Sequence, residues 1–195
     1  YMDRKQELAQ FAAILEQKRF VNALEGNISL FDRESGRIYM TPSGTMKLLL
    51  TPEDVCVLDE TGRQTEGRLR RSSEYRLHLA AYRARADVNA VIHSHCPYLT
   101  AYAQRYTCFR VPQSASLREV FQTFVCLPYG KPGTDEIHRG LAQALAGSPI
   151  CLLGGHGVVC AARDLPTCTG YLDAAENLAK TLFLAAHAQA EHTAL

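Results

Sequence analysis

The stretch that decides the fold is Ala90-Val91-Ile92-His93-Ser94-His95-Cys96-Pro97, an apolar run that ends in two histidines and a proline. It predicts a buried strand at residues 91–94, which Pro97 ends. Side chains alternate between the faces of a strand, so His93 and His95 are expected on one face, one pleat apart. Two such imidazoles suit zinc or another first-row divalent ion that takes one or two further ligands. The alternative is a pair of hydrogen-bonded or surface histidines.

The composition is that of an ordinary globular protein. The 195 residues are the size of a single domain, 1–195, with a substantial core. A net charge of +1 gives no reason to expect nucleic acid or a membrane surface as a partner. No apolar run reaches the length of a bilayer span, and the N-terminal residues predict an amphipathic helix rather than a signal peptide. Seven cysteines without a Cys-x-x-Cys pair predict a reduced, cytoplasmic protein.

The N-terminal part of the chain predicts one helix followed by short strands. Apolar residues with a period near 3.6 predict a surface helix over 3–19. Alternating patterns over 24–31 and 37–41, separated by a turn, predict a hairpin. Residues 51–54 are typical of the first turn of a short helix, with proline at its first position, and 54–59 predict a further strand.

Two segments between these elements are candidate anion sites. The polar loop at residues 41–47 can present backbone N–H groups, Ser43 and Lys47 to an anion, or it is a plain turn. Residues 70–82 contain a helix start with Ser72 or Ser73 as the N-cap, where free N–H groups and the helix dipole favour negative charge.

Two residues in that predicted helix each have two possible roles. Glu74 lies in the first turn, where it either complements the dipole or supplies a ligand. His78 lies one turn further on, among leucines, and is either a packed histidine or a second metal ligand beside Glu74.

The C-terminal part alternates helices with buried strands. Helices are predicted over 97–106, over 135–146 with Thr134 as the cap, and over 165–190. A short strand at residues 125–127 precedes a turn rich in proline and glycine.

A hairpin with a histidine at its tip follows. Apolar residues 150–153 and 158–161 predict two strands, joined by Gly154-Gly155-His156-Gly157. Glycines let the backbone close tightly around His156, as the positioning of a third metal ligand requires.

Five motifs occur in one order along the chain, namely Gly26-Asn27-x-Ser29, Thr41-Pro42-Ser43-Gly44, Ser72-Ser73-Glu74, His93-x-His95 and Gly155-His156-Gly157. Together they resemble the class II aldolase/adducin-head family over essentially the whole chain. The resemblance implies an α/β fold, a three-layer α/β/α sandwich with a mostly antiparallel central sheet. It also implies a divalent metal, usually zinc with Mn²⁺ or Co²⁺ as substitutes. The implied partners are a small-molecule sugar phosphate and further copies of the chain, in a C4 homotetramer with active sites at subunit interfaces.

The resemblance assigns roles to individual residues. His93, His95 and His156 match the metal histidines, and Glu74 matches the acidic residue that completes the metal shell and acts as the catalytic base. The positions that match the substrate phosphate-binding residues are Gly26, Asn27, Ser43, Gly44, Ser72 and Ser73.

The implied activity is metal-dependent cleavage of a ketose 1-phosphate, such as L-fuculose 1-phosphate, into dihydroxyacetone phosphate and an aldehyde such as L-lactaldehyde. The alternatives are a ribulose-phosphate 4-epimerase, a methylthioribulose-phosphate dehydratase or a sugar-acid phosphate decarboxylase of the same family. Glu74 argues against the epimerase, whose pattern has Asp there. A non-catalytic adducin-like binding module is a further alternative, against which the complete set of four ligand residues argues.

The chain departs from the family pattern at residues 115–120. The family's aldolase takes a tyrosine from the neighbouring subunit to handle the aldehyde proton, and residues 115–120 contain none. Either Arg118 or Glu119 occupies that place, or the role is absent.

Overall fold

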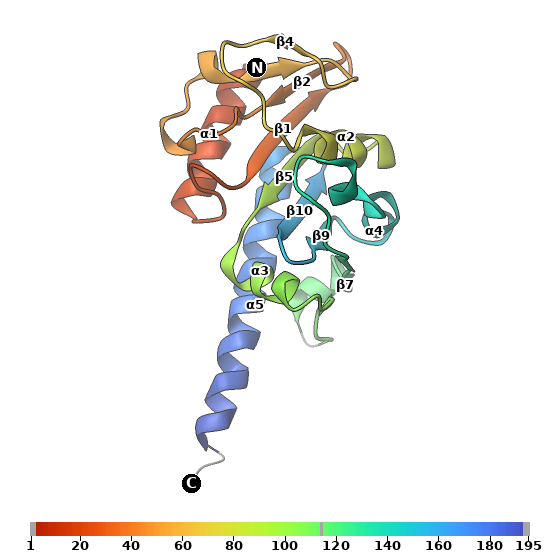
Figure 1. The fold of residues 1–195 in the computed structure, drawn as a ribbon. Coiled ribbons are helices and arrows are strands. Elements are labelled where there is room, and N and C mark those ends of the chain that lie inside the picture. Colours follow the sequence, from red (N-terminus) through yellow and green to blue (C-terminus); the bar gives the residue numbers. More distant parts are fainter. Residues whose placement is uncertain (1–2, 114, 193–195) are drawn as a thin grey trace.

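The computed structural model describes residues 3–113 and 115–192, which form a central sheet with helices on both faces (Figure 1). The strands of the sheet are β1 (Asn27–Asp32), β2 (Arg37–Met40), β3 (Cys56–Leu58), β4 (Gln64–Glu66), β5 (Ala90–Ser94), β8 (Cys126–Leu127), β9 (Ile150–Leu153) and β10 (Gly157–Ala162). In the described residues they form one eight-stranded sheet in the order β4-β3-β2-β1-β5-β10-β9-β8. Each neighbouring pair is antiparallel except β8 and β9. A separate ribbon pairs β6 (Phe109–Arg110) with β7 (Thr123–Phe124).

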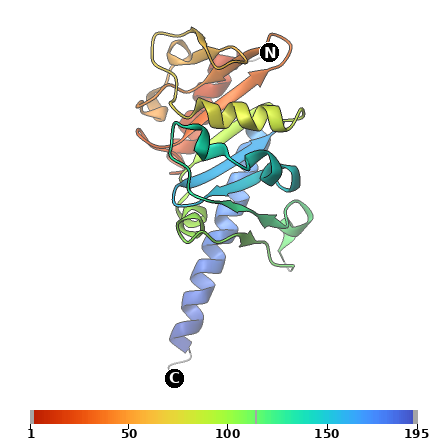
Figure 2. The ribbon, with the colours of Figure 1, turned by 45° about the vertical axis from the view of Figure 1, so that its right-hand side comes forward.

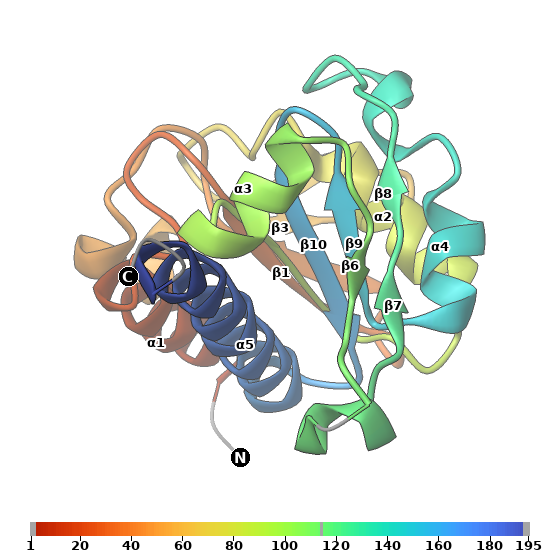
Figure 3. The same ribbon diagram turned by 90° about the horizontal axis from the view of Figure 1, so that it is seen from below.

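The helices divide between the two faces of the sheet. They are α1 (Arg4–Gln17), α2 (Tyr75–Ala84), α3 (Pro97–Gln104), α4 (Leu141–Gly147) and α5 (Leu165–His192). Short 3₁₀ turns are η1 (Lys47–Leu49), η2 (Pro52–Asp54), η3 (Ser116–Glu119) and η4 (Asp135–His138). Helices α1, α3 and α5 cover one face, and α2 and α4 cover the other (Figure 3). The predicted three-layer α/β/α fold with a mostly antiparallel sheet is therefore confirmed.

The two faces of the central strand β5 enter two different cores. Ile92 packs with α1, α3 and α5, whereas its neighbour Val91 packs with α2 and α4. This is the alternation expected of a strand that is buried on both sides. The C-terminal turns of α5 project beyond the sheet (Figure 2).

Several predicted elements are confirmed with small shifts in their ends. The helix predicted over 3–19 is α1, whose N-cap Asp3 accepts a hydrogen bond from the Lys5 N–H. The predicted hairpins are β1–β2 and β9–β10, and the predicted proline-led turn is η2. Strand β1 begins only at Asn27, because Gly26 before it has a φ of +81° that an extended strand excludes.

The N-cap prediction for Ser72 or Ser73 is wrong. Helix α2 begins at Tyr75, so Glu74 occupies the N-cap position. The Ser72 hydroxyl instead accepts a hydrogen bond from the Glu74 N–H at 3.2 Å, which forms a local turn ahead of the helix.

The single helix predicted over 135–146 is also wrong. Thr134 does cap the segment, through a hydrogen bond from the Glu136 N–H, but the turn η4 ends at His138. Gly140 has a φ of +85°, which an α-helix cannot accommodate, so α4 starts afresh at Leu141. Strand β4 was not predicted, because Gln64-Thr65-Glu66 carries no apolar signal.

Most of the cysteines lie in the interior, as their apolar surroundings in the sequence predict. All seven cysteines are free, and five of them are buried as expected for small apolar side chains. Among the described helices, none combines the length and apolarity that crossing a bilayer requires.

Candidate active site

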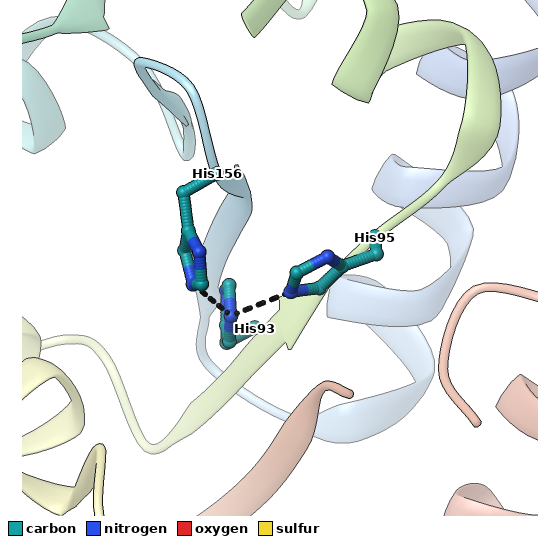
Figure 4. Close-up of side chains that lie close together, drawn as sticks. All are labelled: His93, His95 and His156. Atoms are coloured by element: carbon teal, nitrogen blue, oxygen red, sulfur yellow. Dashed lines mark hydrogen bonds between the residues drawn. The ribbon is translucent and has the colours of Figure 1, made fainter. Parts of the chain in front are cut away.

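Three histidines converge at one end of the sheet (Figure 4). His93 comes from β5, His95 follows that strand directly, and His156 comes from the turn between β9 and β10. The Nε2 atom of His93 lies 3.2 Å from Nε2 of His95 and 3.0 Å from Nε2 of His156. One ligand atom from each ring lies within 4.8 Å of the others, so the three residues can hold one metal ion.

Glycines on the β9–β10 turn make this convergence possible. A Cβ at Gly157 would lie 2.7 Å from the Ser94 carbonyl oxygen and 3.2 Å from Cε1 of His93, so only glycine lets β10 pass the histidines. Gly155 has a φ of +67°, which reverses the chain immediately before His156.

The ring of His93 is oriented by the neighbouring strand. Its Nδ1 lies 3.0 Å from the main-chain oxygen of Val158, an acceptor, so Nδ1 carries the proton and donates. Nε2 is then unprotonated and presents its lone pair to the cluster. A hydrogen bond of this kind on the far nitrogen is the usual support for a metal-binding histidine.

Glu74 is the fourth group of the cluster. Its Oε1 lies 3.1 Å from Nε2 of His156, and its Oε2 lies 3.4 Å from Nε2 of His93. Oε2 also accepts a hydrogen bond from Nδ2 of Asn27 at 2.7 Å. The carboxylate is buried at the N-terminal end of α2. The site therefore brings together β5, the β9–β10 turn and the start of α2, which are far apart in the sequence.

The charges at the site suit a divalent cation. Burial opposes ionisation of Glu74, but the adjacent His93 and the contacts with His156 and Asn27 outweigh it and hold the pKa of Glu74 well below its ordinary value. Burial, together with repulsion from His93 and His156, lowers the pKa of His95 to about 4. Burial also lowers the pKa of His93. A carboxylate together with imidazole nitrogens is the donor set that zinc and similar ions bind.

The three segments predicted to hold a phosphate are neighbours in the structure. The Thr41 N–H donates to the Ile28 carbonyl oxygen at 3.0 Å, which joins the 41–47 loop to β1. The Ser43 N–H donates to the Arg70 carbonyl oxygen at 2.8 Å, which joins the same loop to the segment before α2.

The side chains of these segments differ in their surroundings. Ser43 and Ser73 are exposed, and Gly44 has open space beside its Cα. Ser72 is buried with its hydroxyl bonded to the Glu74 N–H, and Asn27 is buried with its side chain bonded to Glu74.

His78 is a packed histidine and not part of a second metal pair. Its ring nitrogens contact Oδ1 of Asn27 at 2.5 Å and Oγ of Ser29 at 2.6 Å. The hydroxyl of Tyr82 lies 2.6 Å from the same Ser29 oxygen. Sequence reasoning missed this network, although Asn27 and Ser29, alternating in a buried strand, are a signal that one face of β1 is polar.

Comparison with known proteins places the chain in a family. The family model of the class II aldolase and adducin N-terminal domain matches residues 6–183. The chain belongs to this family. The expected resemblance is therefore confirmed.

Individual aldolases show the same relationship. A 5-deoxy-D-ribulose 1-phosphate aldolase from Bacillus thuringiensis serovar kurstaki is 30% identical over 162 residues, which are 83% of this chain and 75% of the relative. An L-fuculose phosphate aldolase from Methanococcus maripaludis is 28% identical over 159 residues, or 82% and 84% of the two chains. The solved structure of an L-fuculose 1-phosphate aldolase has a TM-score of 0.88 and 31% identity, with coverage of 96% of this chain and 88% of that chain.

These relatives establish the class of activity. The chain is a class II aldolase, an enzyme of the lyase class, and not a non-catalytic binding module. Class II aldolases are metal-dependent, in agreement with the histidine cluster.

Proposed function

We propose that this aldolase cleaves a ketose 1-phosphate into dihydroxyacetone phosphate and a short aldehyde. The observation that carries the proposal is the convergence of three histidines and one carboxylate beside exposed serines and an open glycine turn. L-fuculose 1-phosphate and 5-deoxy-D-ribulose 1-phosphate, named in the relatives, are the first substrates to test.

The metal ligands in this proposal are His93, His95, His156 and Glu74. Three imidazole nitrogens and one carboxylate oxygen match zinc, and Mn²⁺ or Co²⁺ suit the same set. When bound, the ion supplies Lewis-acid chemistry, which polarises the ketose carbonyl as the carbon–carbon bond breaks. Neutral histidines leave the ion most of its positive charge.

Glu74 is the proposed catalytic base. In this role the carboxylate accepts the proton from the substrate hydroxyl next to the bond that breaks. The same carboxyl group then returns that proton to the carbon released by the cleavage.

The proposed phosphate site combines main-chain N–H groups with polar side chains. Its members are Gly26, Asn27, Ser43, Gly44, Ser72 and Ser73. The Asn27 amide nitrogen carries two hydrogens, of which Glu74 takes one, so the second is available to a phosphate oxygen. Binding energy from the phosphate is remote from the breaking bond and positions the reacting end.

The wider setting in this proposal is a cytoplasmic C4 homotetramer of single-domain subunits, with a neighbouring subunit at each active site. Leu24 and Leu49, on the segments that flank the site, are 85% and 68% exposed, and a neighbouring subunit would cover such side chains.

The test is a panel of phosphorylated pentuloses and hexuloses assayed for triose phosphate release by the zinc-loaded protein. At least one ketose 1-phosphate is expected to be cleaved, while the matching free sugars are not bound. Failure of the whole panel would overturn the proposed reaction, and equal affinity for phosphorylated and free sugars would overturn the phosphate site.

A further inference from the structure

Five polar side chains form a continuous hydrogen-bonded line behind the histidine cluster, from Tyr82 through Ser29, His78 and Asn27 to Glu74. Their successive contacts are 2.6, 2.6, 2.5 and 2.7 Å long. Two come from alternate positions of β1, and the other three, at intervals of four residues, are the N-cap of α2 and two residues of that helix. The strand and helix periods therefore bring all five onto one shared interface.

Water has almost no access to this line. Ser29 and His78 are fully buried, and Tyr82, Asn27 and Glu74 are 4%, 5% and 8% exposed. The polar atoms that join these five side chains therefore depend on one another for hydrogen-bond partners, since leaving a buried polar group unpaired costs free energy.

The orientation of the Asn27 carboxamide sets the direction of the hydrogen bonds in the line. Its Nδ2 donates to Oε2 of Glu74, which leaves its Oδ1 facing His78. That oxygen only accepts, so Nε2 of His78 carries the proton and donates. Burial favours neutral His78, so its Nδ1 is an acceptor, Ser29 donates to it, and the Tyr82 hydroxyl donates to Ser29.

We infer that His78 is a positioning residue, which acts through Asn27 on Glu74 and on the phosphate site. Its Nε2–H holds the Asn27 carboxamide in the one orientation that presents NH₂ to the carboxylate. A reversed amide would place two acceptors, Oδ1 and Oε2, against each other. The effect on phosphate rests on the proposed function, because the second hydrogen of the same NH₂ group is the one offered to substrate.

The test compares His78→Leu, which removes the donor, with His78→Gln, which offers one donor and one acceptor at a similar spacing. His78→Leu is expected to retain bound zinc, to lower kcat by about 10- to 100-fold and to raise KM for the ketose phosphate, and His78→Gln to restore most of both. Leu79→Ala is the matched control from the same helix, buried in the apolar core away from the line. It is expected to lower Tm at least as much as His78→Leu while leaving KM unchanged.

A second test of the role of His78 measures proton exchange at Asn27 and does not depend on catalysis. The chain has four asparagines, so metal-free protein labelled with ¹⁵N-asparagine gives four carboxamide signals, assignable by replacing Asn22, Asn89 and Asn177 in turn. The Asn27 amide protons are expected to exchange with water at least about tenfold faster in His78→Leu than in wild type or His78→Gln.

Unchanged exchange at Asn27, or a His78→Leu enzyme with wild-type kcat and KM, would overturn the role of His78. If wild-type protein cleaves no ketose phosphate, the proposed function fails, and the exchange measurement still decides whether His78 fixes the amide.

Discussion

Two adjacent residues of β5, Ile92 and His93, are both fully buried and serve opposite faces of the sheet. Ile92 enters the apolar core under α1, α3 and α5, whereas His93 enters the histidine cluster and faces Glu74 at the end of the polar line. On β1 the same division separates Ile28 from Ser29. The difference shows that the polar groups of the site lie on one face of these strands, beside apolar residues such as Val91, whereas the opposite face is apolar at the neighbouring positions.

The polar face remains stable only because its groups are paired. Burying amides, hydroxyls and carboxylates without partners costs free energy, and each of these groups has a partner here. Side chains on the apolar face need no hydrogen-bond partners. Substitutions at the site should therefore lower metal binding or catalysis, whereas substitutions on the apolar face should lower the free energy of unfolding.

The largest effect is expected for His95→Ala on the polar face. Loss of one of three imidazole ligands should abolish stoichiometric metal binding and lower kcat/KM by about 10⁴-fold or more. Metal analysis of the purified variant, paired with the triose phosphate assay, checks both. A variant that keeps its full metal content would show that His95 is not a ligand.

Glu74→Gln should separate metal binding from catalysis. The amide keeps the size of the side chain but cannot accept a proton, so kcat is expected to fall by about 10³-fold while metal stays bound. Steady-state kinetics with parallel metal analysis gives the answer. Normal turnover in this variant would remove Glu74 from the role of base.

Ile92→Ala, on the apolar face, should lower stability and leave metal binding and catalysis unchanged. Removing buried methyl groups is expected to cost about 2–4 kcal/mol of unfolding free energy. Urea unfolding measures that loss, and the folded fraction should keep wild-type metal content and kcat. A large change in kcat per folded molecule would show that the two faces are not independent.

The smallest expected effect is on the pH dependence of stability. Burial lowers the pKa of His78 to about 3 in the folded protein, below the ordinary value near 6.5. Between these values the unfolded chain binds a proton that the folded chain does not, so stability falls as pH falls from 6.5 toward 3.

Metal-free His78→Gln should therefore have a slope between pH 4 and 6 that is shallower than wild type by up to about 1.4 kcal/mol per pH unit. Urea unfolding at several pH values checks this. Parallel wild-type and variant curves would show that His78 is not held neutral by burial.

The same division explains what the sequence could and could not predict. The pair His93 and His95 was predictable because strand geometry alone sets a period of two, and His156 because glycines flank it. The line through His78 was not predictable, because it depends on which helix packs on β1. The N-cap prediction for Ser72 is wrong because sequence cannot tell a cap from a turn two residues earlier. The single helix predicted over 135–146 is wrong because Gly140, with its positive φ, interrupts a segment whose composition favours a helix.

The most direct test of a metal-dependent aldolase site on the polar face is a zinc titration of chelator-stripped protein, followed by dihydroxyacetone phosphate release from a ketose 1-phosphate substrate. We expect activity to be absent after stripping, to rise linearly with added zinc and to level off at about one ion per chain, because the described residues bring together one three-histidine cluster. Full activity in the stripped protein, or a rise with no break near that ratio, would contradict the account.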